Sequence, residues 1–434
     1  MGRATSSWQR VSASRESLPL RITAGLLAQA ESALAELLRF SRPADQALSA
    51  YFRAHGELGG RERALVAEAS FAALRRRRSL AAAARSEEPR ALLIAALTRV
   101  LGFSARALEG LADPAWIAEM RGASSDSFPD AVRADLPDWL WQRLADEHGE
   151  AEAMHIAQGL LNPAPLDLRV NLARISREEA QRRLVADGLE ARPTPFSPAG
   201  LRLAGKPAVN RHSLFKEGLI EVQDEGSQLL AWLVAPRRGE MVADYCAGAG
   251  GKSLALGMLM RSTGRLYAMD VSEKRLAALR PRAARAGLSN IHRIVLSGEA
   301  DPRAKRLVGK LDRVLVDAPC SGFGTLRRNP DLKWRHDAAA VGEMAIKQKR
   351  ILEAAARLVK PGGRLVYATC SILREENEAV TAAFGATAAG FRDLDCTALL
   401  AAQRIPLATG PTLRLWPQRH GTDGFYAAAF QRLS

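Results

Sequence analysis

The stretch MVADYCAGAGGKSLALGML, residues 241–259, decides the fold class, because an apolar run of strand length leads through a glycine-rich turn into a helical pattern. Further apolar runs follow along the chain, with helical segments among them. The runs are 241–245, 265–269, 291–296, 313–316 and 364–368, and the helical segments are 251–261, 273–286 and 341–359. This alternation predicts an α/β fold with a Rossmann-like, mostly parallel, doubly wound sheet that carries helices on both faces.

The glycine turn, from Cys246 to Gly251, comes close to two nucleotide-binding motifs and matches neither. A P-loop requires glycine at the place of Cys246, and the dinucleotide fingerprint requires glycine at the place of Ser253. Asp270 follows the second apolar run, where an acid can accept hydrogen bonds from ribose hydroxyls. A tight turn without a ligand would explain the glycines but not this acid. The turn and the acid together predict a nucleoside cofactor such as S-adenosylmethionine.

Two cysteines follow the ends of later apolar runs. Cys320 comes just after Asp317, and Cys370 follows the run 364–368. In the usual strand order of such sheets these two strands are neighbours, so both thiols are expected at the ligand-binding edge. A single cysteine is most often a small buried apolar residue, which is the interpretation for Cys396. A disulfide between Cys320 and Cys370 remains an alternative that a reducing compartment disfavours.

These residue types suit methylation of a cytosine ring. Carbon 5 of cytosine is a poor nucleophile, but addition of a thiolate at carbon 6 enables it to attack a methyl donor. Asp317 is placed to share a proton with the ring nitrogen N3. A free thiol has a pKa of about 8.5, so a nearby cation should help to ionise it, and Lys252 is the candidate.

The charge of the chain indicates a polyanionic partner. Lys and Arg number 62 against 47 Asp and Glu, which gives a net charge of +15 and favours nucleic acid. The run Arg75–Arg78 could bind phosphates, although taken alone it is more typical of the solvated face of a helix. The cysteines lack the spacing of a zinc site, and no apolar stretch is long enough to span a membrane. We therefore expect a cytoplasmic protein without a bound metal.

The sequence before residue 221 differs in composition and in the spacing of its apolar residues. Residues 22–121 are rich in Ala, Leu and Arg with apolar positions three and four apart, which predicts a helical bundle. A Ser/Asp/Pro-rich stretch ends this pattern, and short strands and helices follow in a small α/β unit. The expected parts are a flexible basic N-terminus over 1–21, a helical domain over 22–123, the α/β unit over 130–220 and the cofactor-binding domain over 221–434.

Several motifs together resemble the Fmu/Sun/RsmB-type RNA cytosine-5 methyltransferases of the NOL/NOP/Sun family. They are DYCAGAGGK at 244–252, DAPCSGFGTLRRNPDLKW at 317–334, YATCSILREEN at 367–377 and HGTDGFYAA at 420–428, with APLDLRVN and GLIEVQDEGSQ upstream. The likeness covers about residue 139 to the end. The preceding helical segment resembles the NusB-like RNA-binding domain of RsmB-type members. The resemblance implies a class I methyltransferase domain preceded by an RRM-like α/β unit and a NusB-like domain.

The resemblance also implies roles for single residues. Cys370 would be the nucleophile, Cys320 would assist release of the product, and Asp317 would contact the base. The residues implied to hold S-adenosylmethionine are Cys246, Ala247, Gly248, Ala249, Gly250, Gly251, Lys252, Asp270, Glu299 and Asp317. Two of them depart from the family pattern, since Ala249 replaces a proline and Glu299 stands where an aspartate is usual.

Four functions are compatible with this pattern. Methylation of ribosomal RNA is favoured by the NusB-like segment, and methylation of transfer RNA uses the same chemistry. A DNA enzyme would have no reason to place a thiol at Cys370, and a non-catalytic assembly factor would have no need of Asp317. We expect looped or single-stranded RNA as the partner, contacted by basic residues interleaved with an aromatic one, although each could equally lie in a solvated loop. These residues are Arg327, Arg328, Lys333, Trp334 and Arg335.

Overall fold

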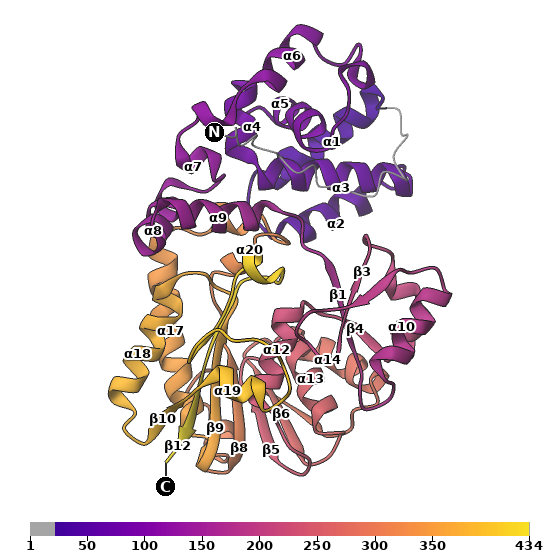
Figure 1. Ribbon diagram of the computed structural model, residues 1–434. Coiled ribbons are helices and arrows are strands. Elements are labelled where there is room, and N and C mark those ends of the chain that lie inside the picture. The colour runs from indigo at the N-terminus through magenta and orange to yellow at the C-terminus, as the bar shows by residue number, and fades with distance from the viewer. Residues whose placement is uncertain (1–21, 434) are drawn as a thin grey trace, which may run out of the picture.

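The computed structural model describes residues 22–433, which form a helical part, a small sheet and a large sheet (Figure 1). The expectation of a flexible basic N-terminus over residues 1–21 lies outside the described residues. Among the residues described, none of the helices combines the length and the hydropathy needed to cross a membrane.

The first part is entirely helical, and its core is a single apolar cluster running from Ile22 to Met120. In its first helix, residues three and four apart line one buried face, as the sequence pattern predicts. Its helices are α1 (Ala24–Leu37), α2 (Ala44–Ala54), α3 (Gly60–Arg75), α4 (Arg77–Ala84), α5 (Pro89–Ala95) and α6 (Pro114–Gly122), with a π-helical turn at Ala96–Val100 and short turns at Ala105–Leu108 and Ser125–Ser127.

Three helices connect this part to the sheets: α7 (Asp130–Arg133), α8 (Asp138–His148) and α9 (Glu150–Leu161). Figure 1 shows α8 and α9 lying between the helical part and the large sheet. Their apolar residues share a core with Phe323, Ile372 and Trp416, which come from loops of the large sheet. These helices therefore support the loops that carry the later motifs.

The small α/β unit is a four-stranded antiparallel sheet in the order β2-β3-β1-β4. Its elements are β1 (Leu166–Val170), α10 (Arg177–Ala186), β2 (Ala191–Pro193), β3 (Gly200–Leu203), α11 (Ser213–Lys216) and β4 (Ile220–Val222), with a short turn at Val209–Arg211. A separate apolar cluster fills the space between this sheet and its helices.

The large sheet has the order β10-β12-β9-β8-β5-β6-β7, with β11 paired to β12. The pairs from β9 through β8, β5 and β6 to β7 are parallel, as the sequence predicts. The strands are β5 (Met241–Asp244), β6 (Arg265–Asp270), β7 (Ile291–Val295), β8 (Leu311–Asp317), β9 (Val359–Thr369), β10 (Phe391–Leu394), β11 (Leu413–Leu415) and β12 (Phe425–Arg432). The order reverses between β5 and β8, and ligands of such sheets bind beyond the strand ends at this point.

Helices cover both faces of the large sheet. In β9, Leu365 and Tyr367 belong to the core under α17 and α18, whereas Val366 and Ala368 belong to the core under α12, α13 and α19. The helices are α12 (Glu225–Val234), α13 (Gly251–Leu259), α14 (Glu273–Arg285), α15 (Pro302–Lys305), α16 (Leu332–Arg335), α17 (Ala338–Ala356), α18 (Glu378–Thr387), α19 (Cys396–Ala401) and α20 (Pro417–His420), with short turns at Phe323–Thr325 and Arg374–Glu376.

The antiparallel C-terminal strands are not predicted by the sequence pattern. β12 lies between β9 and β10, and its residues 425–430 are buried. Because both faces of this strand are covered, its sequence FYAAAFQR lacks the apolar/polar alternation that marks a half-exposed strand.

Candidate active site

The glycine turn between β5 and α13 lies at the carboxyl edge of the large sheet. Gly248 and Gly250 have φ angles of +54° and +83°, a region that favours glycine. A Cβ atom on Gly250 would lie 2.2 Å from a methyl carbon of Leu279, whereas one on Gly248 would meet nothing within 4 Å. The turn is therefore packed at Gly250 and open at Gly248.

Asp270, at the end of β6, holds this turn in place. One carboxylate oxygen accepts a hydrogen bond from the backbone N–H of Gly248 at 2.8 Å, and the other accepts from the N–H of Ser272 at 2.7 Å. Arg282 supports the turn from another side by donating to the carbonyl oxygen of Ala249. The acid singled out in the sequence thus lies against the turn, and its bond to a ribose stays a prediction.

Asp244, the last residue of β5, was not singled out from the sequence. Its side chain is fully buried, and burial raises its pKa to about 7. One carboxylate oxygen accepts from the hydroxyl of Ser253 at 2.7 Å, and the other has no partner among residues 22–433. Asp244, Asp270 and Asp317 place three carboxyl groups around the turn, an environment that suits a positively charged ligand.

The remaining residues expected to hold a cofactor lie around the same turn. The backbone N–H of Ala247 donates to β6, and the carbonyl of Gly251 accepts from an arginine of β1. Burial and the nearby aspartates raise the pKa of the Cys246 thiol well above its usual value. Glu299 follows β7 and is half-buried. Burial, followed by the charges of Cys246 and Glu299, raises the pKa of Tyr245 to about 12. Its contact with an adenine stays a prediction.

Lys252 and Asp317 form an ion pair beside this turn, with Nζ 2.6 Å from a carboxylate oxygen. Burial alone would lower the pKa of Lys252, but the charge and hydrogen bond of Asp317 outweigh burial and raise it. A negative charge on Cys370 would also raise the pKa of Lys252, so this sulfur is near enough to interact with the ammonium group. The lysine thus stays charged where a thiolate would form.

The two sequence-predicted thiols meet at the ends of β8 and β9. The Sγ atoms of Cys320 and Cys370 lie 3.4 Å apart, and both cysteines are free. The hydrogen bond to Cys370, followed by burial, raises the pKa of Cys320 well above its usual value. Cys320 therefore keeps its proton. Cys396, in contrast, is fully buried in the core under α19, and its thiol donates to the carbonyl of Ala427.

A buried carboxylate, Glu376, joins the two cysteine-bearing loops. It accepts from the backbone N–H and the hydroxyl of Ser321 at 2.8 and 2.5 Å, and also from the hydroxyl of Ser371. Gln348 of α17 donates to the same carboxylate at 3.0 Å. The sequence gives no sign of this role, because its partners come from three separate segments and each cysteine is followed only by an ordinary serine.

The HGTDGFYAA motif supports the same loops through its backbone. The N–H of Gly324 donates to the carbonyl of Cys370 at 2.8 Å, and the N–H of Gly424 donates to the carbonyl of Gly324 at 2.8 Å. A Cβ atom on Gly324 would lie 2.2 Å from the carbonyl oxygen of Gly424. Two backbone segments can approach this closely only when neither carries a side chain at that point.

The structure directs most of the basic residues after Cys320 toward other residues of the protein, where the sequence suggested RNA contacts or a solvated loop. Arg327 is buried and donates to the carbonyls of Gly421 and Thr422, and Arg328 pairs with Asp224 and Asp423. Arg335 approaches Asp331 one helical turn away. These side chains bind other residues of the protein. The sequence alone does not show this, because charged residues in a loop are usually exposed to solvent.

Lys333 and Trp334 are also directed inward, toward the helical part. The ammonium group of Lys333 donates to the carbonyl of Arg75 at 2.8 Å, and the indole N–H of Trp334 donates to the carbonyl of Leu74 at 3.2 Å. Both acceptors lie at the C-terminal end of α3, where free carbonyls need donors. Burial lowers the pKa of Lys333 to about 7.

Comparison with known families gives two matches. A family model described as 16S rRNA methyltransferase RsmB/F matches residues 231–431. A second model, for the ferredoxin-like domain of RsmF/B-like methyltransferases, matches residues 136–210. The two matches together cover the small sheet except β4, and the large sheet as far as residue 431.

Similar proteins extend these matches along the chain. The chain is 33% identical to a probable ribosomal RNA small subunit methyltransferase B of Bacillus subtilis over 71% of its own length and 70% of that protein. It is 32% identical to ribosomal RNA small subunit methyltransferase B of Xanthomonas campestris pv. campestris over 86% of its length and 90% of that protein. A solved methyltransferase homologue from Pyrococcus horikoshii, 30% identical, superposes with a TM-score of 0.61, covering 72% of this chain and all of its own.

Proposed function

The chain belongs to the RsmB/F family of S-adenosylmethionine-dependent methyltransferases, and on this premise we propose that it methylates carbon 5 of a cytosine in small-subunit ribosomal RNA. The observation that carries the proposal is the pair of free sulfur atoms, 3.4 Å apart, beside the Lys252–Asp317 ion pair. A methyltransferase that acts on a nucleophilic atom has no need of two thiols at this edge. Carbon 5 of cytosine does need one.

The residues around the glycine turn fit S-adenosylmethionine, which when bound supplies a methyl group on a positively charged sulfur. The carboxyl groups beside the turn would attract such a cation, and the open space at Gly248 would admit it. Asp270 would hold the ribose, and Glu299 the adenine. The ammonium group of Lys252 is already paired with Asp317, so it does not cancel the negative charge of the other carboxyl groups around the turn.

The first chemical task of the protein is to add a sulfur to the cytosine ring. The thiolate of Cys370 attacks carbon 6, and the positive charge of Lys252 stabilises that thiolate beforehand. The Lys252–Asp317 pair holds a proton in a hydrogen bond and can share it with N3 as the ring takes up electrons. Glu376 keeps both cysteine loops in register during this step through Ser321 and Ser371.

The second task is to release the methylated ring. Transfer of the proton from carbon 5 to solvent water re-forms the ring double bond and expels Cys370 as a thiolate. Cys320 retains its proton and can donate it in a hydrogen bond to the departing sulfur. Both sulfur atoms must be free thiols, so we place the reaction in a reducing compartment, the cytoplasm.

Two cysteine variants test the proposal together. Cys370→Ala should give neither 5-methylcytosine nor a covalent complex, whereas Cys320→Ala should accumulate a protein–RNA complex that migrates slowly in a denaturing gel. Cys396→Ala, which removes a thiol outside the site, is the control and should methylate normally. Normal methylation by Cys370→Ala would refute the proposal. Mapping 5-methylcytosine in ribosomal and transfer RNA with and without the gene decides between these two substrates.

A further inference from the structure

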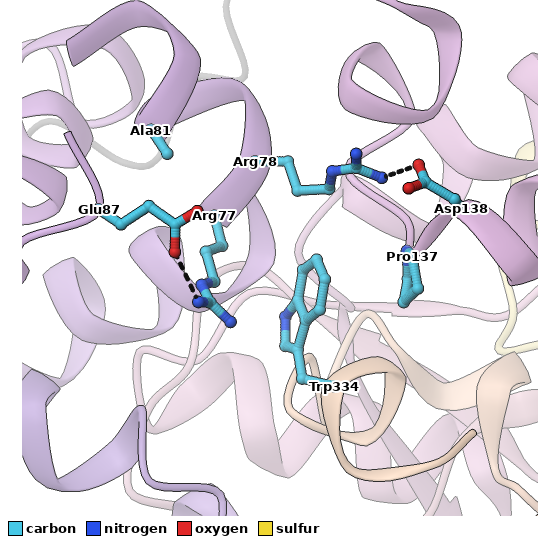
Figure 2. Close-up of a pocket in the computed structure, with 7 residues that line it drawn as sticks. All are labelled: Arg77, Arg78, Ala81, Glu87, Pro137, Asp138 and Trp334. Carbon is cyan, nitrogen blue, oxygen red and sulfur yellow. Dashed lines mark hydrogen bonds and ion pairs between the residues drawn. The ribbon is translucent and has the colours of Figure 1, made fainter. Parts of the chain in front are cut away.

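A cleft of about 290 Å³ lies where the helical part meets the large domain. Its walls are formed by α4, Glu87 in the loop after it, the residues before and at the start of α8, and α16. Figure 2 shows Trp334 standing between the Arg77–Glu87 pair on one side and Pro137 with the Arg78–Asp138 pair on the other. Clefts between domains are frequent sites of ligand binding, and this volume is near the lower end of their range.

Trp334 offers a fixed aromatic surface in this cleft. Its indole N–H is held by the carbonyl of Leu74, so the position of the ring is set by the end of α3. The guanidinium of Arg77 lies 5.4 Å from the centre of this ring and 5.7 Å from that of Phe40. An anchored indole beside a guanidinium is the arrangement on which an unpaired nucleobase stacks.

The two arginines are held more firmly than their acidic partners. The side chains of Arg77 and Arg78 are 28% and 26% exposed, while those of Glu87 and Asp138 are 73% and 81% exposed. Arg78 is fixed further by donating to the backbone carbonyl of Leu136 at 2.6 Å. Such exposed carboxylates contribute little to ion pairs and can swing away, which leaves two guanidinium groups for a phosphate.

We propose that this cleft binds one unpaired nucleotide of the substrate RNA other than the target cytosine, with its base against Trp334 and its phosphate on Arg77 and Arg78. The choice of RNA as the ligand rests on the proposed function. The cleft joins the helical part to the segment that carries Cys320, so one RNA chain would contact both parts. The sequence-based expectation of stacking on Trp334 is thus kept, but the phosphate contacts come from α4 rather than from the arginines after Cys320.

Two variants of Trp334 separate stacking from folding, with an in vitro transcript of 16S rRNA as the probe. Trp334→Phe loses the hydrogen bond to Leu74 but keeps an aromatic face, and should bind nearly as tightly as the wild type. Trp334→Leu loses both, and its Kd should rise by about 5- to 150-fold, the range for one stacked base. Equal Kd values for the two variants would overturn the stacking contact.

Charge variants test the phosphate contact in both directions. Arg77→Gln/Arg78→Gln should reduce the slope of log Kd against log salt by about 0.7, the value for one neutralised phosphate of a single strand. Glu87→Gln removes a competing carboxylate and should bind more tightly than Glu109→Gln, an exposed acid elsewhere on the helical part. An unchanged salt slope, or equal binding by the two glutamine variants, would overturn the phosphate contact.

Methylation at saturating RNA distinguishes this inference from the proposed function. All the cleft variants should methylate at the wild-type single-turnover rate once RNA is saturating, because none of them touches the cysteine pair. Failure of the wild type to make 5-methylcytosine would reject the proposed function, while the binding measurements would still decide whether RNA occupies the cleft.

Discussion

Residues 317–335 form one segment, and at its two ends lie buried charged groups that make different numbers of hydrogen bonds. At its start, the carboxylate of Glu376 accepts hydrogen bonds from Ser321, Ser371 and Gln348, so its charge is well compensated. At its end, the ammonium of Lys333 donates to a single carbonyl, and the attraction of Asp135 is opposed by the like charges of Arg75 and Arg76. The active-site loops are therefore fixed by a charge with several hydrogen bonds, whereas the contact between α16 and α3, the junction, contains a charge with only one.

The largest effect is expected when the charge of Glu376 in the active site is removed. Glu376→Gln keeps the shape of the side chain but weakens its bonds to Ser321 and Ser371, so the cysteine pair loses its alignment. We expect the single-turnover methylation rate to fall by about 10²-fold, the cost of a displacement on the order of 1 Å. The Kd for RNA should stay unchanged.

Glu378→Gln is the matched control, since this nearby acid pairs with Arg414 and is 38% exposed. It should methylate at a rate close to that of the wild type. A similar loss of rate in both variants would show that position 376 matters only through general stability. A loss of RNA affinity without a loss of rate would reject the positioning role.

Removing the charge of Lys333 at the junction should change the free energy of unfolding but not the rate of methylation. The pKa of Lys333 is about 7 in the folded protein and near 10.5 in the unfolded chain, so between these values the unfolded chain binds more protons. The stability that Lys333 contributes therefore increases with pH from about 7 to 10.5, by up to about 1.4 kcal/mol per pH unit.

Urea unfolding of the wild type and of Lys333→Met at pH 7 and pH 9 measures this linkage. The wild type should gain stability relative to the variant at pH 9, and both should methylate saturating RNA at similar rates. A difference in stability that is independent of pH, or that falls as the pH rises, would contradict the assignment of a depressed pKa to Lys333.

The smallest effect is expected at Asp331, whose carboxylate accepts from the backbone N–H of Ala44 at the start of α2. Asp331→Asn keeps an acceptor but removes the negative charge from the positive end of that helix. The variant should lose about 0.3 to 1 kcal/mol of stability, measured by urea unfolding, with no change in methylation rate. A large loss of activity would show that the junction controls the cysteine loop directly.

The sequence predicts the parallel strands and the meeting of Cys320 and Cys370, because neighbouring strand ends set both. It does not reveal Glu376, whose partners are brought together only by the fold. It also suggests a solvent-facing role for Arg327 and Lys333, since charged residues in loops are usually exposed. The contacts of Glu299 and Asp270 with a cofactor, and the domain limits, remain predictions.

Trapping the covalent bond to the cytosine ring would show whether Cys370 is the nucleophile. RNA that carries 5-fluorocytosine should remain attached after methyl transfer, because fluorine cannot leave carbon 5 as a proton does. Mass spectrometry of the digested complex should then find the nucleotide on the peptide that contains Cys370. Attachment to Cys320 instead, or no covalent complex with RNA that is methylated when unfluorinated, would contradict the account.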